Sequence, residues 1–497
     1  MSLIRRNVFA NFVGGGLLAV MTLVITPLQI RILGMEAFGI VGFIVTLQMA
    51  FTAFDFGLSN TVTREIAADS SVGKSESDAL IRTAMTVYGI AAILLGGTLV
   101  VLAGPIARSW FNPETMEVVE LEQSLRVIAL YLAMRWPVAL YVGILSGFQR
   151  MDILNVIKVA MTSVRLLGGI LVLLQWRSLD AFLWWTAANA VLEVVAYDIA
   201  CRRVHPGLPL RPGFSIATVR RIWRYSASLN VLSILAVLIV QADRLVISET
   251  QTLEVLGYYS LAYTTASVVV LLIGAVSSAV FPWFTEAHEA GDPGLLKDRY
   301  SNASWAMMFV VGLAAPILIF YGHFLLALWV SEQAADSAGT ATALLAAGFW
   351  VGAAVSVGYN AALAQGRPRR PLVVGALSFV PYVAAIYLLV DRWGANGAAL
   401  AWLLLQVSNA VLLVPFITRR VIGTELKPWL TRIVLPLLLL AGLAFGSLKL
   451  ISVEWLGGGF YANAATLSLA TLIYLFVGYR ISPTPLLNAK LRNLFGA

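Results

Sequence analysis

The chain has 497 residues, of which 59% are hydrophobic and only 12% are charged, and its mean hydropathy is +0.84. A typical soluble domain is about 45–50% apolar and about 25% charged, so this composition excludes a soluble protein and indicates a polytopic membrane protein. The single cysteine, Cys201, excludes an internal disulfide, and the three histidines lack metal-ligand spacing, so we predict no metal site and no cofactor. Although the net charge is +8, Lys and Arg are not clustered into a nucleic-acid-binding face.

Fourteen apolar stretches are long enough to span a bilayer, which takes about 20 residues. They lie at 8–30, 37–59, 83–104, 126–148, 156–174, 181–200, 226–248, 258–282, 304–330, 341–364, 373–390, 398–418, 432–450 and 462–478. With the N-terminus in the cytoplasm, 25 of the 34 Lys and Arg fall on cytoplasmic segments, as the positive-inside rule requires. We therefore expect an all-α protein with both termini in the cytoplasm.

Two parts of the chain resemble each other. Gly147-Phe-Gln-Arg150, followed by a helix and Asn189, recurs as Gln365-Gly366-Arg367, followed by a helix and Asn409, which matches Gly147 to Gly366 and Asn189 to Asn409. A repeat of six helices gives two parallel lobes, which is a transporter architecture. The predicted parts are a six-helix lobe at 1–205, a basic cytoplasmic linker at 206–225, a second six-helix lobe at 226–420, and two further helices with a cytoplasmic tail at 421–497.

Polar side chains concentrate on one face of several predicted helices, at 100° per residue. These residues are Asn11 and Gln29 in the first helix, Gln48, Thr52, Asp55 and Ser59 in the second, Lys158 and Arg165 in the fifth, Trp185, Asn189 and Glu193 in the sixth, and Asn230, Gln241 and Arg244 in the seventh. Several polar faces together predict a shared wet cavity. Hydrogen bonding between helices is the simpler explanation for any single Ser, Thr or Asn.

Buried charges point to the chemistry of this cavity. A charge near the bilayer centre costs about 2.5–3.5 kcal/mol on insertion scales, so Arg135, Arg165 and Glu193 need a partner or a function. Glu193 can pair with Arg165 as a structural ion pair, but two arginines against one carboxylate leave the cavity cationic. Arg binds phosphate oxygens bidentately, which favours an anionic cargo.

The predicted site follows from this argument. The diphosphate path comprises Arg135, Arg165, Lys158 and Arg244, the cavity carboxylates are Glu193 and Asp55, and the polar or aromatic lining comprises Asn11, Gln29, Gln48, Asn189, Asn230, Gln241, Trp136 and Trp185. Anchoring at the membrane interface is the alternative role for the two tryptophans.

Enzyme signatures are absent from the sequence, which contains no Walker A motif, no GxGxxG and no Ser/His/Asp cluster. The chain is therefore expected to be a transporter rather than an enzyme, driven by an ion gradient or by the gradient of its substrate. A membrane-embedded polysaccharide polymerase or ligase is the alternative from another class. It is disfavoured because such chemistry normally uses a large outer loop, and the predicted outer loops are all shorter than about 25 residues.

Several short strings resemble, in order, the landmarks of Wzx-type polysaccharide flippases over about residues 5–420. They are Pro27-x-x-x-Arg31-x-Leu33-Gly34 with Phe38-Gly39, Asp55-Phe-Gly57-Leu-Ser-Asn60 with Arg64-Glu65-Ile66-Ala67, Gly147-Phe-Gln-Arg150, Gly257-Tyr-Tyr-Ser-Leu-Ala262, Gly366-Arg367, and Gly394-x-x-Gly397-Ala-Ala. The resemblance implies membership of the multidrug/oligosaccharidyl-lipid/polysaccharide exporter superfamily, whose lobes rock in alternating access.

The same resemblance implies a function in cell-surface polysaccharide biosynthesis. Such a flippase moves polyprenyl-diphosphate-linked oligosaccharide from the inner to the outer leaflet of the bacterial inner membrane. Its partners would be the lipid-linked glycan, membrane lipids, and polysaccharide polymerase and export proteins. A lipid II flippase and a multidrug exporter of the same superfamily stay open as alternatives, and the intramembrane arginines argue against export of organic cations.

Overall fold

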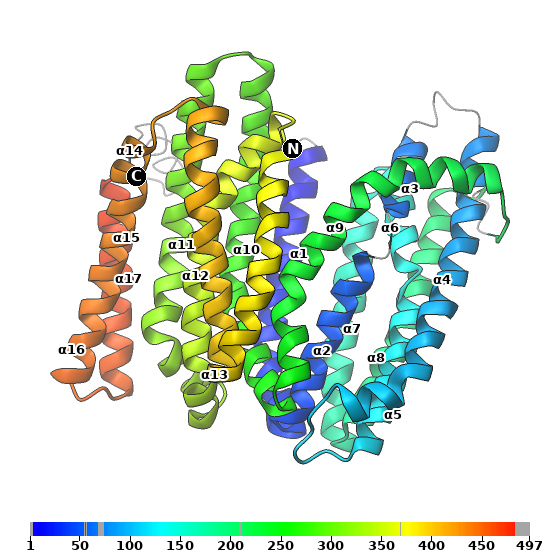
Figure 1. The fold of residues 1–497 in the computed structure, drawn as a ribbon, viewed down its shortest axis with the longest axis horizontal. Helices are drawn as coiled ribbons and strands as arrows, with labels where there is room; N and C mark the ends of the chain where they lie inside the picture. The colour runs from blue at the N-terminus through cyan, green and yellow to red at the C-terminus, as the bar shows by residue number, and fades with distance from the viewer. Residues whose placement is uncertain are drawn as a thin grey trace. The chain divides into compact units, whose positions relative to one another are not determined.

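The computed structural model describes residues 3–53, 55, 57–67, 74–207, 211–367 and 369–482. Within these ranges, the side chains of 3–13, 53, 74–77, 217, 219, 221–233 and 369–372 lie outside the description. The described residues form helices joined by loops, and their one β-bridge pairs Asn112 with Thr252. The chain divides into two compact units, Met1–Gly257 and Tyr258–Ala497 (Figure 1).

The first unit is built from nine helices within the described ranges. They are α1 (Leu3–Leu33), α2 (Met35–Ala53), α3 (Leu58–Ala67), α4 (Lys74–Ser109), α5 (Val118–Arg135), α6 (Val138–Gly147), α7 (Met151–Trp176), α8 (Leu179–Val204) and α9 (Ile216–Thr250). Helix starts follow local capping rules: Ser178 Oγ accepts from the Ala181 amide before α8, and Ser215 Oγ accepts from the Thr218 amide before α9.

The second unit contains the rest of the helices. They are α10 (Leu253–Glu289), which begins at the end of the first unit, α11 (Pro293–Trp329), α12 (Glu332–Ala364), α13 (Arg369–Phe416), α14 (Leu426–Trp429), α15 (Leu435–Ala441), α16 (Leu448–Glu454) and α17 (Phe460–Arg480), with π-helical turns at Ile417–Ile422, Leu430–Val434 and Gly442–Ser447. In α13 two helices meet at Gly394, whose φ of 52° is left-handed.

The helices are long and apolar enough to cross a membrane. Twelve such stretches occur among the described residues, and one of them, Val373–Ile422, contains the two helices that meet at Gly394. The 35-residue α9, which holds the predicted span 226–248, is a further long helix. Large apolar side chains such as Ile93 and Val101 are about three-quarters exposed, which suits contact with lipid. The chain is an all-α, multi-pass membrane protein, as the composition predicted.

The second predicted span, 37–59, is wrong at its end. Helix α2 stops at Ala53, and α3 begins at Leu58 after a turn in which Gly57 has a φ of 66°. The side chain of Asp55 accepts hydrogen bonds from Ser59 Oγ at 2.7 Å and from the Ser59 amide at 3.4 Å. Asp55 therefore caps a new helix instead of continuing the old one.

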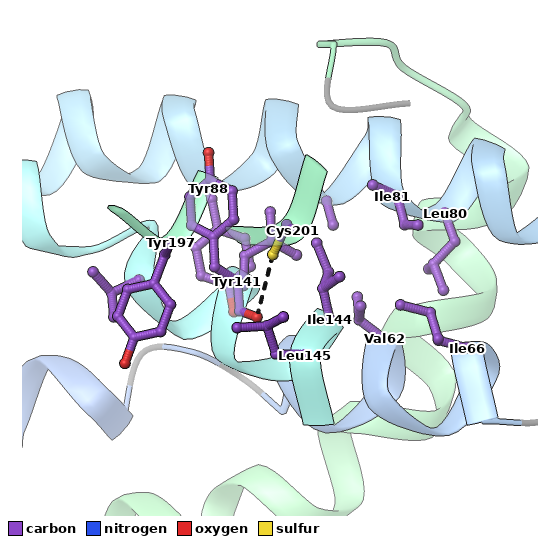
Figure 2. Packing of buried hydrophobic residues seen from close by; sticks show 13 residues of the cluster. Val62, Ile66, Leu80, Ile81, Tyr88, Tyr141, Ile144, Leu145, Tyr197 and Cys201 are labelled. Carbon is purple, nitrogen blue, oxygen red and sulfur yellow. Dashed lines mark hydrogen bonds between the residues drawn. The ribbon is translucent and has the colours of Figure 1, made fainter. Parts of the chain in front are cut away.

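The core of the first unit lies where α3, α4, α6 and α8 meet (Figure 2). Glycines let two of these helices approach closely: a Cβ at Gly143 would lie 2.7 Å from the Ser59 carbonyl oxygen, and one at Gly147 would lie 2.7 Å from Ile66 Cβ. This Gly-x-x-x-Gly spacing is typical of packed membrane helices. It holds α3 against α6, and these two helices supply part of the cavity wall described below.

The repeated turn has a register that differs from the prediction. Gln149 and Gly366 both have left-handed φ values, 56° and 67°, and the amides of the next residues, Arg150 and Arg367, both donate five residues back, at 2.9 Å. The structural counterpart of Gly366 is therefore Gln149 rather than Gly147, because the turn is defined by its left-handed residue. The predicted lobes and the linker at 206–225 stay predictions, although α9 already begins at Ile216, inside that range.

In the second unit the C-terminal helices pack on α11. Trp305, Phe309 and Tyr474 stack with ring centroids 4.8 and 5.5 Å apart and planes within 14° of parallel. Trp429 Nε1 donates to Ser304 Oγ at 3.0 Å. Aromatic stacking and a buried hydrogen bond therefore join the predicted extra helices to the body of this unit.

Candidate functional site

A cavity of about 410 Å³ lies within the first unit. It is lined by Gln48, Phe51 and Thr52 from α2, Asp55 from the following turn, Ser59 from α3, Leu132 and Arg135 from α5, Trp136 from the break after α5, and Val138, Ala139 and Val142 from α6. The volume lies in the range of small-molecule binding sites. Polar groups on a wall that is otherwise apolar make it a candidate site.

Two interrupted helices meet at this cavity. One interruption lies between α2 and α3, where Asp55 and Gly57 are in turn conformation, and the other is the turn at Trp136–Pro137 between α5 and α6. Pro137 has no amide hydrogen to continue the helix. Within a membrane, irregular backbone is tolerated where it is buried in protein or lines a water-filled cavity, and broken helices mark the binding sites of many transporters. Both breaks therefore single out the same place.

Arg135 pairs with Glu193 of α8. Its Nε lies 3.0 Å from Glu193 Oε2 and its Nη2 lies 3.4 Å from Oε1, which is a two-pronged pair. The Arg135 side chain is 27% exposed, whereas that of Glu193 is 11% exposed. The guanidinium thus reaches the cavity wall while the carboxylate lies behind it.

The alternative in which Glu193 pairs with Arg165 is wrong, because Glu193 pairs with Arg135 of α5. Arg165 Nη1 instead donates to Tyr131 Oη at 3.2 Å, and Tyr131 Oη donates to Gln48 Oε1 at 3.1 Å. Tyr131 precedes Arg135 by one helical turn on α5. The guanidinium of Arg165 therefore contacts the face of α5 that carries Arg135. A hydrogen-bonded chain thus runs from α7 through α5 to Gln48 on the cavity wall.

Asp55 forms the acidic part of the cavity. Its Oδ1 accepts a hydrogen bond from Tyr88 Oη of α4, while its Oδ2 accepts from Ser59. In the sequence, Asp55 lies on one predicted helical face with Gln48 and Ser59. The helix is broken, but the three residues still line one cavity because α3 returns along α6. Tyr88 was missed, since no periodicity on one helix reports a contact with another.

Trp185 lies outside this lining, although Trp136 belongs to it. Trp185 Nε1 donates to the carbonyl oxygen of Arg165 at 3.1 Å, and its ring covers Gly168 of α7. A Cβ at Gly168 would lie 2.6 Å from Trp185 Cε2. Trp185 therefore fixes α8 against α7.

The other predicted site residues are spread over the first unit. Asn189 is buried with its Nδ2 unpartnered among the described residues, Lys158 is exposed on α7, and Gln29, Gln241 and Arg244 are each less than 10% exposed. Arg244 Nη1 donates to Gln241 Oε1 at 3.1 Å. None of these five belongs to the cavity lining. Asn11 and Asn230 lie outside the residues whose side chains are described.

The charge of the cavity differs from the expected cationic one. Its lining carries one arginine, Arg135, and one carboxylate, Asp55, and Glu193 neutralises Arg135 from behind. We predicted a cationic cavity because two arginines and one carboxylate lie in neighbouring spans. In the structure only Arg135 of the two arginines lines the cavity, because Arg165 donates to Tyr131.

A second, acidic cavity of about 500 Å³ lies where α1 ends and α5 and α8 begin. Buried Glu36 accepts from the amides of Glu114 at 2.7 Å and Thr115 at 2.9 Å, which fixes the loop between α4 and α5. No group of three or more His, Cys, Asp or Glu among the described residues is placed to hold a metal ion.

Comparison with known proteins identifies the family. The family described as Polysaccharide biosynthesis protein matches residues 4–288, which is more than half of the chain. The chain belongs to this family. One relative is named "Putative O-antigen transporter" and comes from Shigella flexneri. It is 24% identical to this chain over 431 residues, which cover 84% of this chain and 98% of that protein. The resemblance noted in the sequence is thereby confirmed.

Two solved structures of other proteins share the fold of this chain. The lipid II flippase MurJ in an inward closed conformation matches with a TM-score of 0.75 at 12% identity, over 94% of this chain and 98% of that one. A multidrug resistance MATE family transporter of the MOP superfamily, in an inward-facing conformation, matches with a TM-score of 0.70 at 13% identity, over 81% and 94%. At these identities the similarity establishes the fold alone, which is that of MurJ and MATE transporters.

Proposed function

We propose that this polysaccharide biosynthesis protein is a flippase that moves polyprenyl-diphosphate-linked oligosaccharide from the inner to the outer leaflet by alternating access. The family and the similarity to the Shigella flexneri relative support a lipid-linked polysaccharide as the cargo. The observation that carries the proposal is an arginine on the wall of a cavity where two broken helices meet, among helices apolar enough to span a membrane.

The physical task matches this arrangement. A polyprenyl tail is soluble in lipid, but a charged, sugar-bearing head group cannot cross about 30 Å of hydrocarbon unaided. The cavity offers the head group a polar surface at Arg135, Asp55 and Gln48, and Trp136 offers an aromatic face on which a sugar ring can stack. Arg135 would hold phosphate oxygens through its planar fork of donors.

Arg165, Lys158 and Arg244 complete the proposed diphosphate path. Arg165 is joined to the cavity wall through Tyr131 and Gln48. Lys158 lies seven residues before it on α7, about 20° around the helix, with an exposed side chain. Arg→Lys at 135 or 165 should restore part of the function that Arg→Ala removes, because Lys offers a point charge instead of a fork.

The protein is proposed to lie in the bacterial inner membrane with both termini in the cytoplasm. The asymmetry of Lys and Arg among the loops supports this orientation. Cysteines introduced singly at 479–482 and in the loop 110–117 should react with a membrane-impermeant maleimide from opposite sides. Labelling of 479–482 from the periplasm in intact cells would contradict the orientation.

The test of function is flipping in proteoliposomes of defined lipids. Purified protein should expose a fluorescent polyprenyl-diphosphate oligosaccharide in the outer leaflet faster than protein-free liposomes do. The same assay with lipid II tests the alternative suggested by the fold, and uptake of an organic cation tests the multidrug alternative. Movement of only lipid II or only the cation would refute the proposed cargo. The absence of covalent change in the cargo, read by mass spectrometry, distinguishes a transporter from a polymerase or ligase.

A further inference from the structure

One of the two-pronged donor faces of Arg135 that a diphosphate could use is already occupied. Glu193 takes both Nε and Nη2, which together form one of the two-pronged faces of a guanidinium. A second anion approaching that face meets a carboxylate of like charge at hydrogen-bond distance. Since like charges at close range in a poorly solvated site repel strongly, the diphosphate and Glu193 compete for Arg135.

A displaced Glu193 has a waiting donor on its own helix. Asn189 lies one turn earlier on α8, so the two side chains are neighbours on one face. Asn189 is 2% exposed, and its Nδ2 is a buried donor without a hydrogen-bond partner among the described residues. A buried amide without a hydrogen-bond partner destabilises a folded protein. It would gain a partner if the Glu193 carboxylate turned from Arg135 toward it.

We propose that Glu193 is a resident substitute for the substrate diphosphate: it holds Arg135 while the site is empty and moves to Asn189 when a diphosphate takes its place. This role of Glu193 rests on the proposed function, because it describes how diphosphate binding at Arg135 is regulated. Glu193 thereby raises specificity, because weak single anions do not compete with a two-pronged carboxylate. Arg135 and Tyr131 from α5, Tyr197 on α8 itself, and Arg165, through Tyr131, are the charged or titratable groups around it.

The test uses the full chain in lipid nanodiscs and two soluble probes, farnesyl diphosphate and farnesyl monophosphate. Glu193→Gln keeps the size of the side chain and removes its charge, so the diphosphate should bind about tenfold more tightly than to wild type. Discrimination against the monophosphate should fall. Asp198→Asn is the matched control: it removes a carboxylate from the same helix, one that pairs with Arg202 instead, and should leave both affinities unchanged.

Asn189→Ala tests the second position. In the wild-type background it should weaken diphosphate binding severalfold, and in the Glu193→Gln background it should change binding little, because the uncharged side chain no longer needs a partner. Unchanged affinity in Glu193→Gln, or equal losses from Asn189→Ala in both backgrounds, would overturn the inference.

The proposed function fails in a different way from the inference. If wild type binds the diphosphate and Arg135→Ala abolishes binding, while Glu193→Gln has no effect, then the proposed site stands and only the substitution model falls. If neither wild type nor Glu193→Gln binds the diphosphate, both are refuted. Circular dichroism and monodispersity of each variant establish that the fold is retained.

Discussion

Removing the two partners of the Arg135–Glu193 pair, singly and together, should give strongly unequal losses of stability. In Arg135→Gln, Glu193 is left charged with its side chain only 11% exposed. Leaving a buried charge uncompensated costs about 3–5 kcal/mol. In Glu193→Gln, Arg135 keeps 27% of its side-chain surface exposed and borders the cavity, so water can replace the lost partner. That loss should be only about 1–2 kcal/mol after allowance for solvent screening.

The double variant tests whether Arg135 and Glu193 stabilise the fold as a pair. Arg135→Gln with Glu193→Gln removes both charges, so its loss should be about 1–2 kcal/mol, close to that of Glu193→Gln alone and far below the sum of the two single losses. Unfolding by sodium dodecyl sulfate in mixed micelles, followed by tryptophan fluorescence, measures the three free energies of unfolding. Additive losses would refute the reasoning, because they would mean that the two side chains do not interact. Asp198→Asn serves again as the control for a carboxylate that is paired at the exposed end of α8.

Three further predictions concern the surroundings of the cavity. Gly168→Ala should destabilise the first unit by about 1–3 kcal/mol, because the new methyl group overlaps the ring of Trp185; Gly97→Ala, in a helix position with no neighbour within 4 Å, should leave the unfolding midpoint unchanged or raise it. Arg165→Ala should retain normal abundance on an immunoblot yet abolish polymer export in cells, since Arg165 bonds a tyrosine and leaves no carboxylate unpaired; equal loss of both would favour a structural role. Glu36→Gln should speed protease cleavage in the loop between α4 and α5, because one amide oxygen replaces two carboxylate oxygens as acceptor of its backbone amides; an unchanged cleavage rate would mean that the loop is fixed by its other contacts.

Much of the fold could be predicted because the membrane simplifies the sequence. A helix must satisfy its own backbone in hydrocarbon and needs about 20 apolar residues, so apolar length alone located most of the long helices. The break after Ala53 could not be located in this way. It depends on Asp55 binding the following turn and on the left-handed φ of Gly57, and both are local events inside an apolar run.

The candidate site was predicted in part. Arg135, Glu193, Asp55 and Gln48 were named from the sequence because charge and polarity inside a span are rare and therefore informative. Their pairing was not predictable, since a helical period gives the face of one helix but not which neighbour it meets. Glu193 faces α5 instead of α7 for that reason.

Several of the family landmarks prove to be turns and close contacts. Gly39 lies against the Leu253 carbonyl group and Gly257 lies against that of Met35, which brings the N-terminal ends of α2 and α10 together. Gly394 and Gly366 have left-handed φ values at turns. These sequence strings are therefore signs of the fold. Arg135 and Glu193, on which the proposed cargo depends, lie outside them.

The most direct test of the central claim is the flipping rate of Arg135 variants in proteoliposomes at matched protein content. If Arg135 holds the diphosphate, Arg135→Ala should lower the rate for a polyprenyl-diphosphate oligosaccharide by about 10²-fold, Arg135→Lys should recover part of it, and Arg135→Glu should abolish it. To separate binding from folding, the Arg135→Ala rate is measured in the Glu193→Gln background as well, where the pair leaves no unpaired carboxylate. A wild-type rate for Arg135→Ala in that background would contradict the claim that this arginine carries the cargo.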